Sequence, residues 1–306
     1  MSNTYGEKFR VTTYGESHGL AVGAIIDGCP AGVTIDMEAI NVALTRRRQG
    51  APRQEEDRIV WLSGLLDGIT LGTPIAFEIR NFDARPSDYD GMEDLFRPGH
   101  ADYTYYMKYG LRDHRGGGRS SARETVARVV AGCIARQLMP EVDIKVKCEK
   151  WIEESDGDTV GGVVSCCVTG IPAGIGEPLY GKLNAQLAAA MMSIPSAIGF
   201  EMGAGFAAAK MKGSEYIDRW EVESGGTKTS TNHCGGIQGG ITNGMPIEFS
   251  VAFHPVATLP QPVECLHKDG KLQSRNIVGR HDRSHVDRAA AVVEAMTALC
   301  LINYML

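Results

Sequence analysis

The chain has 306 residues, 43% of them hydrophobic and 22% charged, with a formal net charge of −6. These values describe a globular protein with ample core, and the acidic balance excludes a general attraction for nucleic acid. No apolar run is long enough to cross a bilayer, and the polar first residues carry no secretory signal. The length permits one or two domains. We expect residues 1–306 to form one cytoplasmic α/β domain that binds neither nucleic acid nor a membrane.

Periodicity predicts strands and helices distributed along the whole chain. Helices are expected at about 36–48, 101–108, 120–138, about 178–192 and 287–304. Strands are expected at 9–14, 59–63, 74–80, 144–149, 205–211 and 247–253, besides short apolar strands that begin near residues 23 and 162. Long glycine-rich loops at 81–99, 223–246 and 254–280 hold most of the unusual polar residues, which favours a functional role for them.

Two stretches of the chain resemble each other. A short apolar strand leads into Pro-Ala-Gly at residues 30–32, and a second one leads into the same tripeptide at residues 172–174. A helix is predicted after each. The pattern favours two structurally related halves, although Pro-Ala-Gly is also a common turn.

The most informative segment is GGGRSSARET, residues 116–125. Glycines allow a ligand to approach the main chain closely, and a helix N-terminus attracts anions. Ser121 and Glu124 have capping-box spacing, so Arg119 and Arg123 are expected at a helix start that binds an anion. The alternative is an ordinary capped helix with solvated arginines.

Further polar clusters lie on other turns and loops. Residues 15–19 (GESHG) place His18 on a tight turn, residues 96–102 (FRPGHAD) bring an arginine near a histidine, and residues 279–283 (GRHDR) add Arg, His and Asp. Four arginines also lie between residues 46 and 53, and the planar arginine side chain suits carboxylate and phosphate groups. Together these clusters predict a site that binds several anionic groups and moves protons.

Other kinds of site are less well supported. Metal-ligand types occur at Glu16, His18, His100, Asp102, His281 and Asp282. They lack the His-x-x-x-His spacing of a zinc enzyme, and nearby arginines would repel a cation, so we expect no metal and keep a metal-dependent phosphohydrolase as an alternative. P-loop and Rossmann fingerprints are absent. The eight cysteines form no C-x-x-C pair and are expected to be reduced, and Cys234 has no nucleophile signature.

These motifs, with KYGLRD at 108–113 and NHCGGIQGG at 232–240, occur in the order and spacing of the chorismate synthase family, which the chain resembles from about Gly6 to its end. The resemblance implies conversion of 5-enolpyruvylshikimate 3-phosphate to chorismate and phosphate by a 1,4-anti elimination that requires reduced FMN. It also implies an α/β fold with a helical core sandwiched between two antiparallel β-sheets, assembled as a homotetramer.

The resemblance also assigns roles to residues. His18 would protonate the departing phosphate, His100 would stabilise the reduced flavin, and Asp282 would act with the flavin to remove the ring proton. The anionic substrate would be bound by Arg47, Arg53, Arg97, Arg123 and Arg280. FMN would be bound by Arg119, Ser120, Ser121, Pro195, Ser196, Gly239, His254, Pro255, Val256, Ala257, Thr258 and Arg280.

The chain departs from the family pattern at several points. Arg283 replaces a usual proline, His254 a usual lysine, and Pro195-Ser196 a usual Asn-Ala, while the region at about 141–160 is shorter. A second hypothesis is therefore a non-catalytic descendant that binds flavin or another anion. The sequence leaves open whether NADPH serves as an intrinsic reductant. Because no nicotinamide motif is visible, we expect an external flavin reductant.

Overall fold

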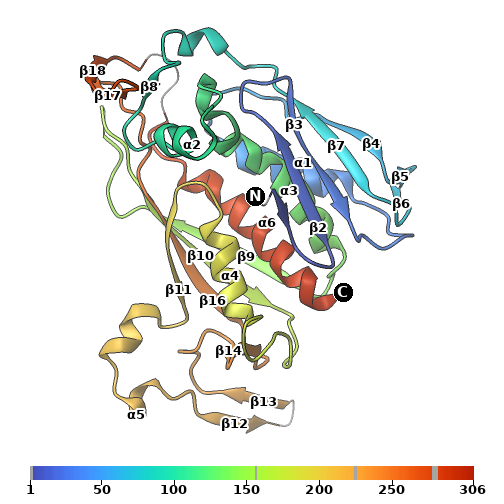
Figure 1. Ribbon diagram of the computed structural model, residues 1–306. Helices are drawn as coiled ribbons and strands as arrows, with labels where there is room; N and C mark the ends of the chain where they lie inside the picture. The colour runs from blue at the N-terminus through green and yellow to red at the C-terminus, as the bar shows by residue number, and fades with distance from the viewer. Residues whose placement is uncertain (1–2, 156, 224–225, 278–281) are drawn as a thin grey trace.

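Two antiparallel sheets enclose a layer of helices in the computed structural model, which describes residues 3–155, 157–223, 226–277 and 282–306 (Figure 1). The first sheet has the strand order β1 (Thr4–Tyr5), β2 (Arg10–Gly15), β3 (Ala21–Asp27), β7 (Ile75–Arg80) and β4 (Ile59–Ser63). The second has the order β11 (Ala197–Met202), β16 (Ile247–Phe253), β10 (Gly162–Thr169) and β9 (Asp143–Glu149). The predicted sandwich is confirmed.

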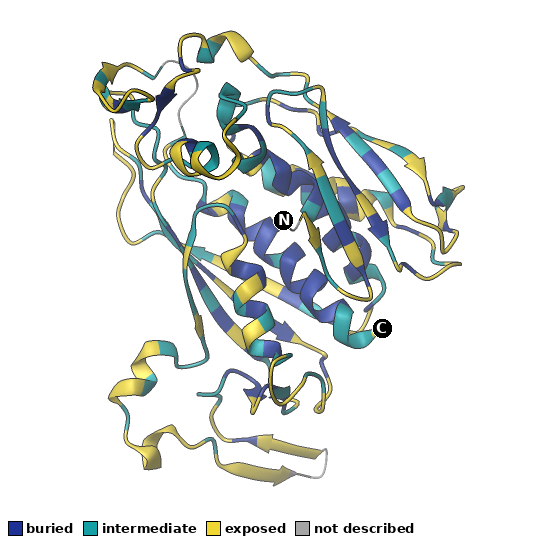
Figure 2. Ribbon diagram, in the orientation of Figure 1, coloured by how far each residue is buried: buried dark blue, intermediate teal, exposed yellow. Residues whose placement is uncertain are grey.

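The helices bury their apolar residues between the sheets (Figure 2). They are α1 (Met37–Arg48), α3 (Thr125–Gln137), α4 (Leu183–Met192) and α6 (Val286–Met305). At the crossing of α3 and α6, a Cβ added to Gly132 would lie 2.5 Å from the Cα of Ala295. Glycine is therefore needed for the two central helices to approach this closely.

A buried threonine fixes the Pro-Ala-Gly turn of the first half. Thr70 belongs to β6 (Ile69–Thr70), which pairs with β5 (Leu65–Leu66). Its Oγ1 donates to the carbonyl of Pro30 at 2.6 Å and accepts from the amide of Val33 at 2.9 Å. The backbone amide of Gly32 donates to the carbonyl of Thr70 at 2.8 Å.

The second half repeats these bonds around Thr242, in β15 (Ile241–Thr242), which pairs with β14 (Ile237–Gln238). Its Oγ1 donates to the carbonyl of Pro172 at 2.7 Å and accepts from the amide of Ile175 at 2.9 Å. The amide of Gly174 donates to the carbonyl of Thr242 at 2.9 Å. Equivalent bonds in equivalent places support the two related halves that the sequence suggested.

Three local expectations are wrong. Residues 205–211 form a 3-10 helix, η4 (Gly205–Lys210), instead of a strand, because Gly203 and Gly205 adopt φ values of 55° and 50° that break an extended backbone. The helix expected at 178–192 begins only at Leu183. The helix expected at 120–138 begins at Thr125, after the 3-10 turn η3 (Ala122–Glu124).

The loops between the sheets contain short elements. The loops before α3 hold η1 (Pro86–Tyr89), β8 (Leu95–Phe96), α2 (Asp102–Tyr109) and η2 (Arg115–Ser120), and β17 (Val263–His267) joins β8 to β18 (Leu272–Arg275). An arm with α5 (Gly213–Tyr216), β12 (Trp220–Glu223) and β13 (Gly226–Thr229) extends from the second sheet (Figure 1).

Within the described residues, no helix combines the length and apolarity needed to span a membrane.

Replacing Thr70 or Thr242 with valine should destabilise the fold to a similar extent. Either change removes the hydroxyl partner of a partly buried amide and a partly buried carbonyl, at a cost of about 0.5–1.5 kcal/mol each. The free energy of unfolding from urea titrations measures this. Thr227→Val, at an exposed position of β13, is the control and should change stability by less than about 0.5 kcal/mol. Unequal losses in the two threonine variants would contradict the equivalence of the two turns, and losses no larger than that of Thr227→Val would contradict the role of the hydroxyls.

Candidate active site

His18 lies on a turn that the glycine-rich loop contacts directly. The turn is closed by the amide of Gly19 donating to the carbonyl of Glu16 at 3.1 Å, and Ser17 Oγ lies 3.0 Å from His18 Nδ1. A Cβ on Gly116 would lie 2.3 Å from His18 Cε1, and Gly116 has a φ of 61°. No side chain fits there, so glycine lets the loop approach the imidazole.

Tyr89, which the sequence analysis missed, lies between two of the predicted site residues. Its ring meets that of His18 edge to face, with centroids 5.0 Å apart, and the Arg97 guanidinium carbon lies 5.8 Å from its centroid. Tyr89 and Arg97 line a cavity of about 250 Å³ together with Arg275. No residue pattern around Tyr89 sets it apart in the sequence.

Arg97 is held by a buried bidentate pair. Its Nε donates to Asp102 Oδ2 at 2.8 Å and its Nη2 to Asp102 Oδ1 at 3.1 Å. Burial alone would raise the pKa of Asp102, but the hydrogen bonds and charge of Arg97 outweigh it and lower that pKa. Asp102 thus remains a carboxylate and fixes the arginine beside the cavity.

His100 contacts the segment at residues 254–258. Its Nδ1 donates to the carbonyl of Pro98 at 2.9 Å, which leaves Nε2 to accept from the hydroxyl of Thr258 at 3.0 Å. Burial, followed by the charge of Arg97, lowers the pKa of His100. The ring is therefore neutral at pH 7, with its proton on Nδ1.

The same segment leads on to the end of α4. The amide of His254 donates to the carbonyl of Ser196 at 3.1 Å. Ser193 Oγ accepts from Arg128 at 2.8 Å, and Arg128 pairs with Glu124 at 2.8 Å. Glu124 in turn lies 3.5 Å from Arg119 Nη1. A continuous series of contacts thus connects the predicted flavin residues at 119–121, 195–196 and 254–258.

One expectation about this region needs revision, and the cofactor-binding role of Gly239 stays a prediction. The capping box does not form, because Ser121 Oγ accepts from the amide of Arg123 at 3.3 Å while Glu124 pairs with arginines. Gly239 lies away from the other predicted flavin residues. Its neighbour Gly240 accepts from the amide of Leu183 at the start of α4, whereas residues 195–196 follow the end of that helix, about 15 Å along its axis.

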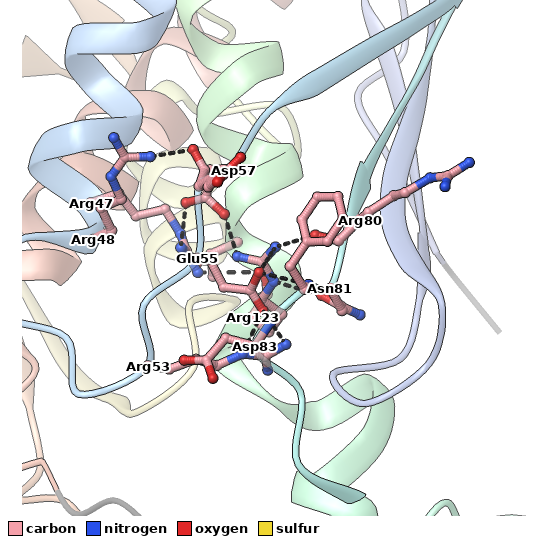
Figure 3. Close-up of polar contacts among 12 residues, drawn as sticks. Arg47, Arg48, Arg53, Glu55, Asp57, Arg80, Asn81, Asp83 and Arg123 are labelled. Carbon is pink, nitrogen blue, oxygen red and sulfur yellow. Dashed lines mark hydrogen bonds and ion pairs between the residues drawn. The ribbon is translucent and has the colours of Figure 1, made fainter.

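Three of the predicted substrate-binding arginines surround two buried carboxylates (Figure 3). Arg123 pairs with Asp57, and the Nη1 of Arg47 lies 3.7 Å from Asp57 Oδ2. Arg53 Nε donates to Glu55 Oε1 at 2.7 Å. Sequence reasoning missed both acids, although their position directly after the arginine cluster was a usable signal.

These contacts occupy much of the arginines' donor capacity. Arg123 Nε donates to Asn81 Oδ1 at 2.9 Å, Arg47 Nη2 donates to the carbonyl of Ala122 at 2.9 Å, and Arg53 Nη1 donates to the carbonyl of Ser17 at 2.9 Å. Burial lowers the pKa of Arg47 to about 10, so it remains charged at pH 7. The three arginines and the two carboxylates that they contact together carry one excess positive charge. Direct substrate contact by these arginines stays a prediction.

Asp282, the predicted proton acceptor, lies near the start of α6. Asp282 Oδ1 pairs with Arg288 Nη2 at 2.7 Å. Arg280 and His281 lie outside the described residues. His285, next in the chain after Ser284, contacts His254 with ring centroids 6.2 Å apart, and the sequence analysis did not single it out.

Comparison with known proteins identifies the family. The family model described as chorismate synthase matches residues 9–153 and 147–306. The chain belongs to the chorismate synthase family. It is 48% identical to the chorismate synthase of Porphyromonas gingivalis, over 98% of this chain and 95% of that relative, and 45% identical to that of Opitutus terrae, over 99% and 96%. A crystal structure of chorismate synthase superimposes with a TM-score of 0.77 at 28% identity, covering 98% of this chain and 92% of that one.

The comparison also supports the shortening expected at about 141–160. The P. gingivalis alignment runs over 348 positions and this chain has 306 residues, so at least 42 positions have no counterpart here. The two stretches matched by the family model meet at residues 147–153. In the structure, β9 ends at Glu149 and β10 begins at Gly162, so only a short connection joins them.

Two observations on the described residues bear on the alternative chemistries. In the part of the chain that the structure describes, no three His, Cys, Asp or Glu side chains gather closely enough to hold a metal ion. Burial, followed by a hydrogen bond to Asp218, raises the pKa of Cys234. A raised pKa disfavours the thiolate that a cysteine nucleophile requires.

Asp57→Asn should destabilise the protein strongly. The amide keeps the shape but removes the charge that Arg47 and Arg123 share, and breaking a buried pair costs about 3–5 kcal/mol. Guanidinium chloride unfolding measures the change. Asp94→Asn, in an exposed pair with Lys268, is the matched control and should cost less than about 1 kcal/mol. Similar losses in both variants would count against the central role of Asp57.

His285 should make the fold sensitive to acid. Burial, with smaller contributions from Arg288 and His254, lowers its pKa from 6.5 to about 4. The unfolded chain therefore takes up the proton first, and stability falls as pH decreases from about 6.5 to about 4, by roughly 3 kcal/mol in all. Unfolding at several pH values should show this loss in the parent and in a His233→Asn control but not in His285→Asn. A parallel pH profile in His285→Asn would overturn the assignment.

Proposed function

We propose that this chain converts 5-enolpyruvylshikimate 3-phosphate to chorismate and phosphate with reduced FMN, as a homotetramer supplied by an external flavin reductant. The observation that carries the proposal is the continuous set of contacts that joins His18, Arg97 and His100 to the segments at 119–121, 195–196 and 254–258, in a chain of this family. Residues predicted separately as substrate-binding and cofactor-binding thus border one region.

The residues present fit a flavin with a phosphate group. Ser196 adopts a φ of 70°, unusual for serine, directly beside His254. The Nε2 of His285, next to His254, is enclosed and has no hydrogen-bond partner among the described residues. Buried polar atoms in folded proteins nearly always have a partner, which can be a protein group, an ordered water or an ion. Reduced flavin, when bound, would supply electron density to the substrate as phosphate leaves.

The cavity beside Arg97 brings two cations near His18. Arg97 and Arg275 line it together with Asp88 and Asp90, and the bidentate pair with Asp102 fixes the Arg97 side chain before any ligand arrives. A preorganised cation stabilises developing negative charge without reorganisation. His18 reaches the same region through Tyr89 and is the group proposed to donate a proton to the departing phosphate.

The other two catalytic residues have distinct settings. His100, neutral with its proton directed at the carbonyl of Pro98, is suited to packing against the cofactor segment rather than to releasing a proton. Asp282 is proposed as the proton acceptor. Its ion pair with Arg288, which α6 supplies, holds the carboxylate in place near His254 and His285.

Anaerobic phosphate release with photoreduced FMN tests the proposal. The parent should release phosphate and form chorismate only with reduced flavin, and His18→Ala and Asp282→Asn should each lower the rate by about 10²–10⁴-fold by removing a proton-transfer group. His267→Asn, on β17, is the control and should keep the parent rate.

Three results would contradict the proposal. Equal rates with oxidised FMN would remove the flavin requirement. Retention of FMN without chorismate formation would instead favour a non-catalytic descendant. Phosphate release that needs stoichiometric metal and no flavin would favour a hydrolase.

A further inference from the structure

Asn81 lies directly after β7 and holds the turn that carries His18. Its Nδ2 donates to two carbonyls of that turn, to that of Glu16 at 3.0 Å and to that of Gly19 at 2.9 Å. Its backbone amide donates to the carbonyl of Leu20 at 3.1 Å, which extends the pairing of β3 with β7 by one residue. One side chain, placed by the sheet, therefore bridges the beginning and the end of the turn.

The opposite end of the same amide faces the arginine cluster. Asn81 Oδ1 accepts from the Nε of Arg123 at 2.9 Å, and Arg123 pairs through Nη1 with Asp57 (Figure 3). A guanidinium only donates and a backbone carbonyl only accepts, so these partners fix which way the amide is turned. Its oxygen must face Arg123 and its nitrogen must face the turn. The side chain is thus a link between the buried ion pairs and the backbone around His18.

Arg53 provides a second hold on the turn, because its Nη1 donates to the carbonyl of Ser17 at 2.9 Å. Arg53 binds the middle of the turn, whereas Asn81 binds both ends and so fixes the direction in which the chain leaves β2 and enters β3. The ring of Tyr89 packs against that of His18 with centroids 5.0 Å apart. A small rotation of the turn would therefore change the position of the imidazole relative to Tyr89.

We propose that Asn81 is a positioning residue for the reaction, which keeps the His18 imidazole where it donates its proton. Because its two ends bind the turn and Arg123, the acid and the arginine cluster keep one fixed arrangement. Misplacing a reacting group by about 1 Å can lower a rate by about 10²-fold. Asn81 acts through His18, so this inference rests on the proposed function for the role of that histidine.

Two substitutions separate the two ends of the amide. Asn81→Asp keeps an acceptor for Arg123 but loses both N–H donors to the turn, and Asn81→Ala loses both ends. Each variant should lower kcat by about 10–10²-fold, with a smaller change in the KM for the substrate, because the turn is released in both. Turnover is measured anaerobically with photoreduced FMN.

Asn303 offers a matched control, because its side chain also holds a separate backbone segment. Its Oδ1 accepts from the amide of Lys8 at 2.9 Å, and its Nδ2 donates to the carbonyl of Leu299 at 2.8 Å. It lies in the last turn of α6, about 25 Å along the helix axis from Val286. Asn303→Asp and Asn303→Ala should keep the parent kcat even where they lower the midpoint of urea unfolding.

The ring signals of His18 report the position of the turn without turnover. In NMR spectra of the chain without ligands they are identified by their loss in His18→Ala. They should shift in Asn81→Asp and Asn81→Ala, because the ring moves relative to Tyr89, and stay in place in the two Asn303 variants.

Parent kcat in both Asn81 variants, a loss confined to KM, or unchanged His18 signals would each overturn the positioning role. Failure of the proposed function gives a different result. In that case His18→Ala would keep the parent rate of phosphate release, while the Asn81 variants would still shift the His18 signals. The hold of Asn81 on the turn would then stand, and the assignment of His18 as the proton donor would fall.

Discussion

The structure depends on neutralising charge that the fold has buried. Asp57 and Glu55 have almost no exposed side-chain surface, and each faces arginines from other segments. Burying such ions costs several kcal/mol apiece unless each has partners. The pairing therefore requires the ends of α1, β7 and η3 to lie together. Asn81, after β7, accepts a further hydrogen bond from Arg123 (Figure 3). The turn that carries His18 is attached to this cluster through Arg53.

The duplicated architecture explains why one end of the molecule carries the site. Each half contributes a sheet, a threonine-fixed turn and a central helix, and the two central helices cross at Gly132 and Ala295. Both helices begin beside the site, α3 next to the arginine cluster and α6 next to His254. Their positive N-terminal ends therefore act on the same region. An acidic protein thus obtains a locally cationic site from its topology as well as from its arginines.

The two halves have diverged in the chemistry that they carry. The end of β7 leads to Asn81 and the buried carboxylate cluster, which the first half uses to hold arginines. The corresponding end of β16 leads to His254, where the second half has two neighbouring imidazoles and the ion pair of Asp282 with Arg288. A related backbone therefore carries paired arginines at one of these strand ends and a pair of imidazoles at the other. Such a division suits a reaction that involves both a multiply charged substrate and proton movement.

The sequence by itself determined most of the elements through periodicity, and its resemblance to a family implied the layered fold. Alternation in strands and helical periodicity are local, so β4, β7, β16, α1 and α6 lie close to their expected bounds, and short motifs carry the family's chemistry in order. Only the tertiary structure decided how the polar residues are used. Arg123 was expected to face an anion at a helix start but pairs with Asp57, 66 residues away. Tyr89, which no sequence pattern singled out, packs against His18. Burial and the partners available to a charge depend on contacts between distant segments, and no local pattern encodes them.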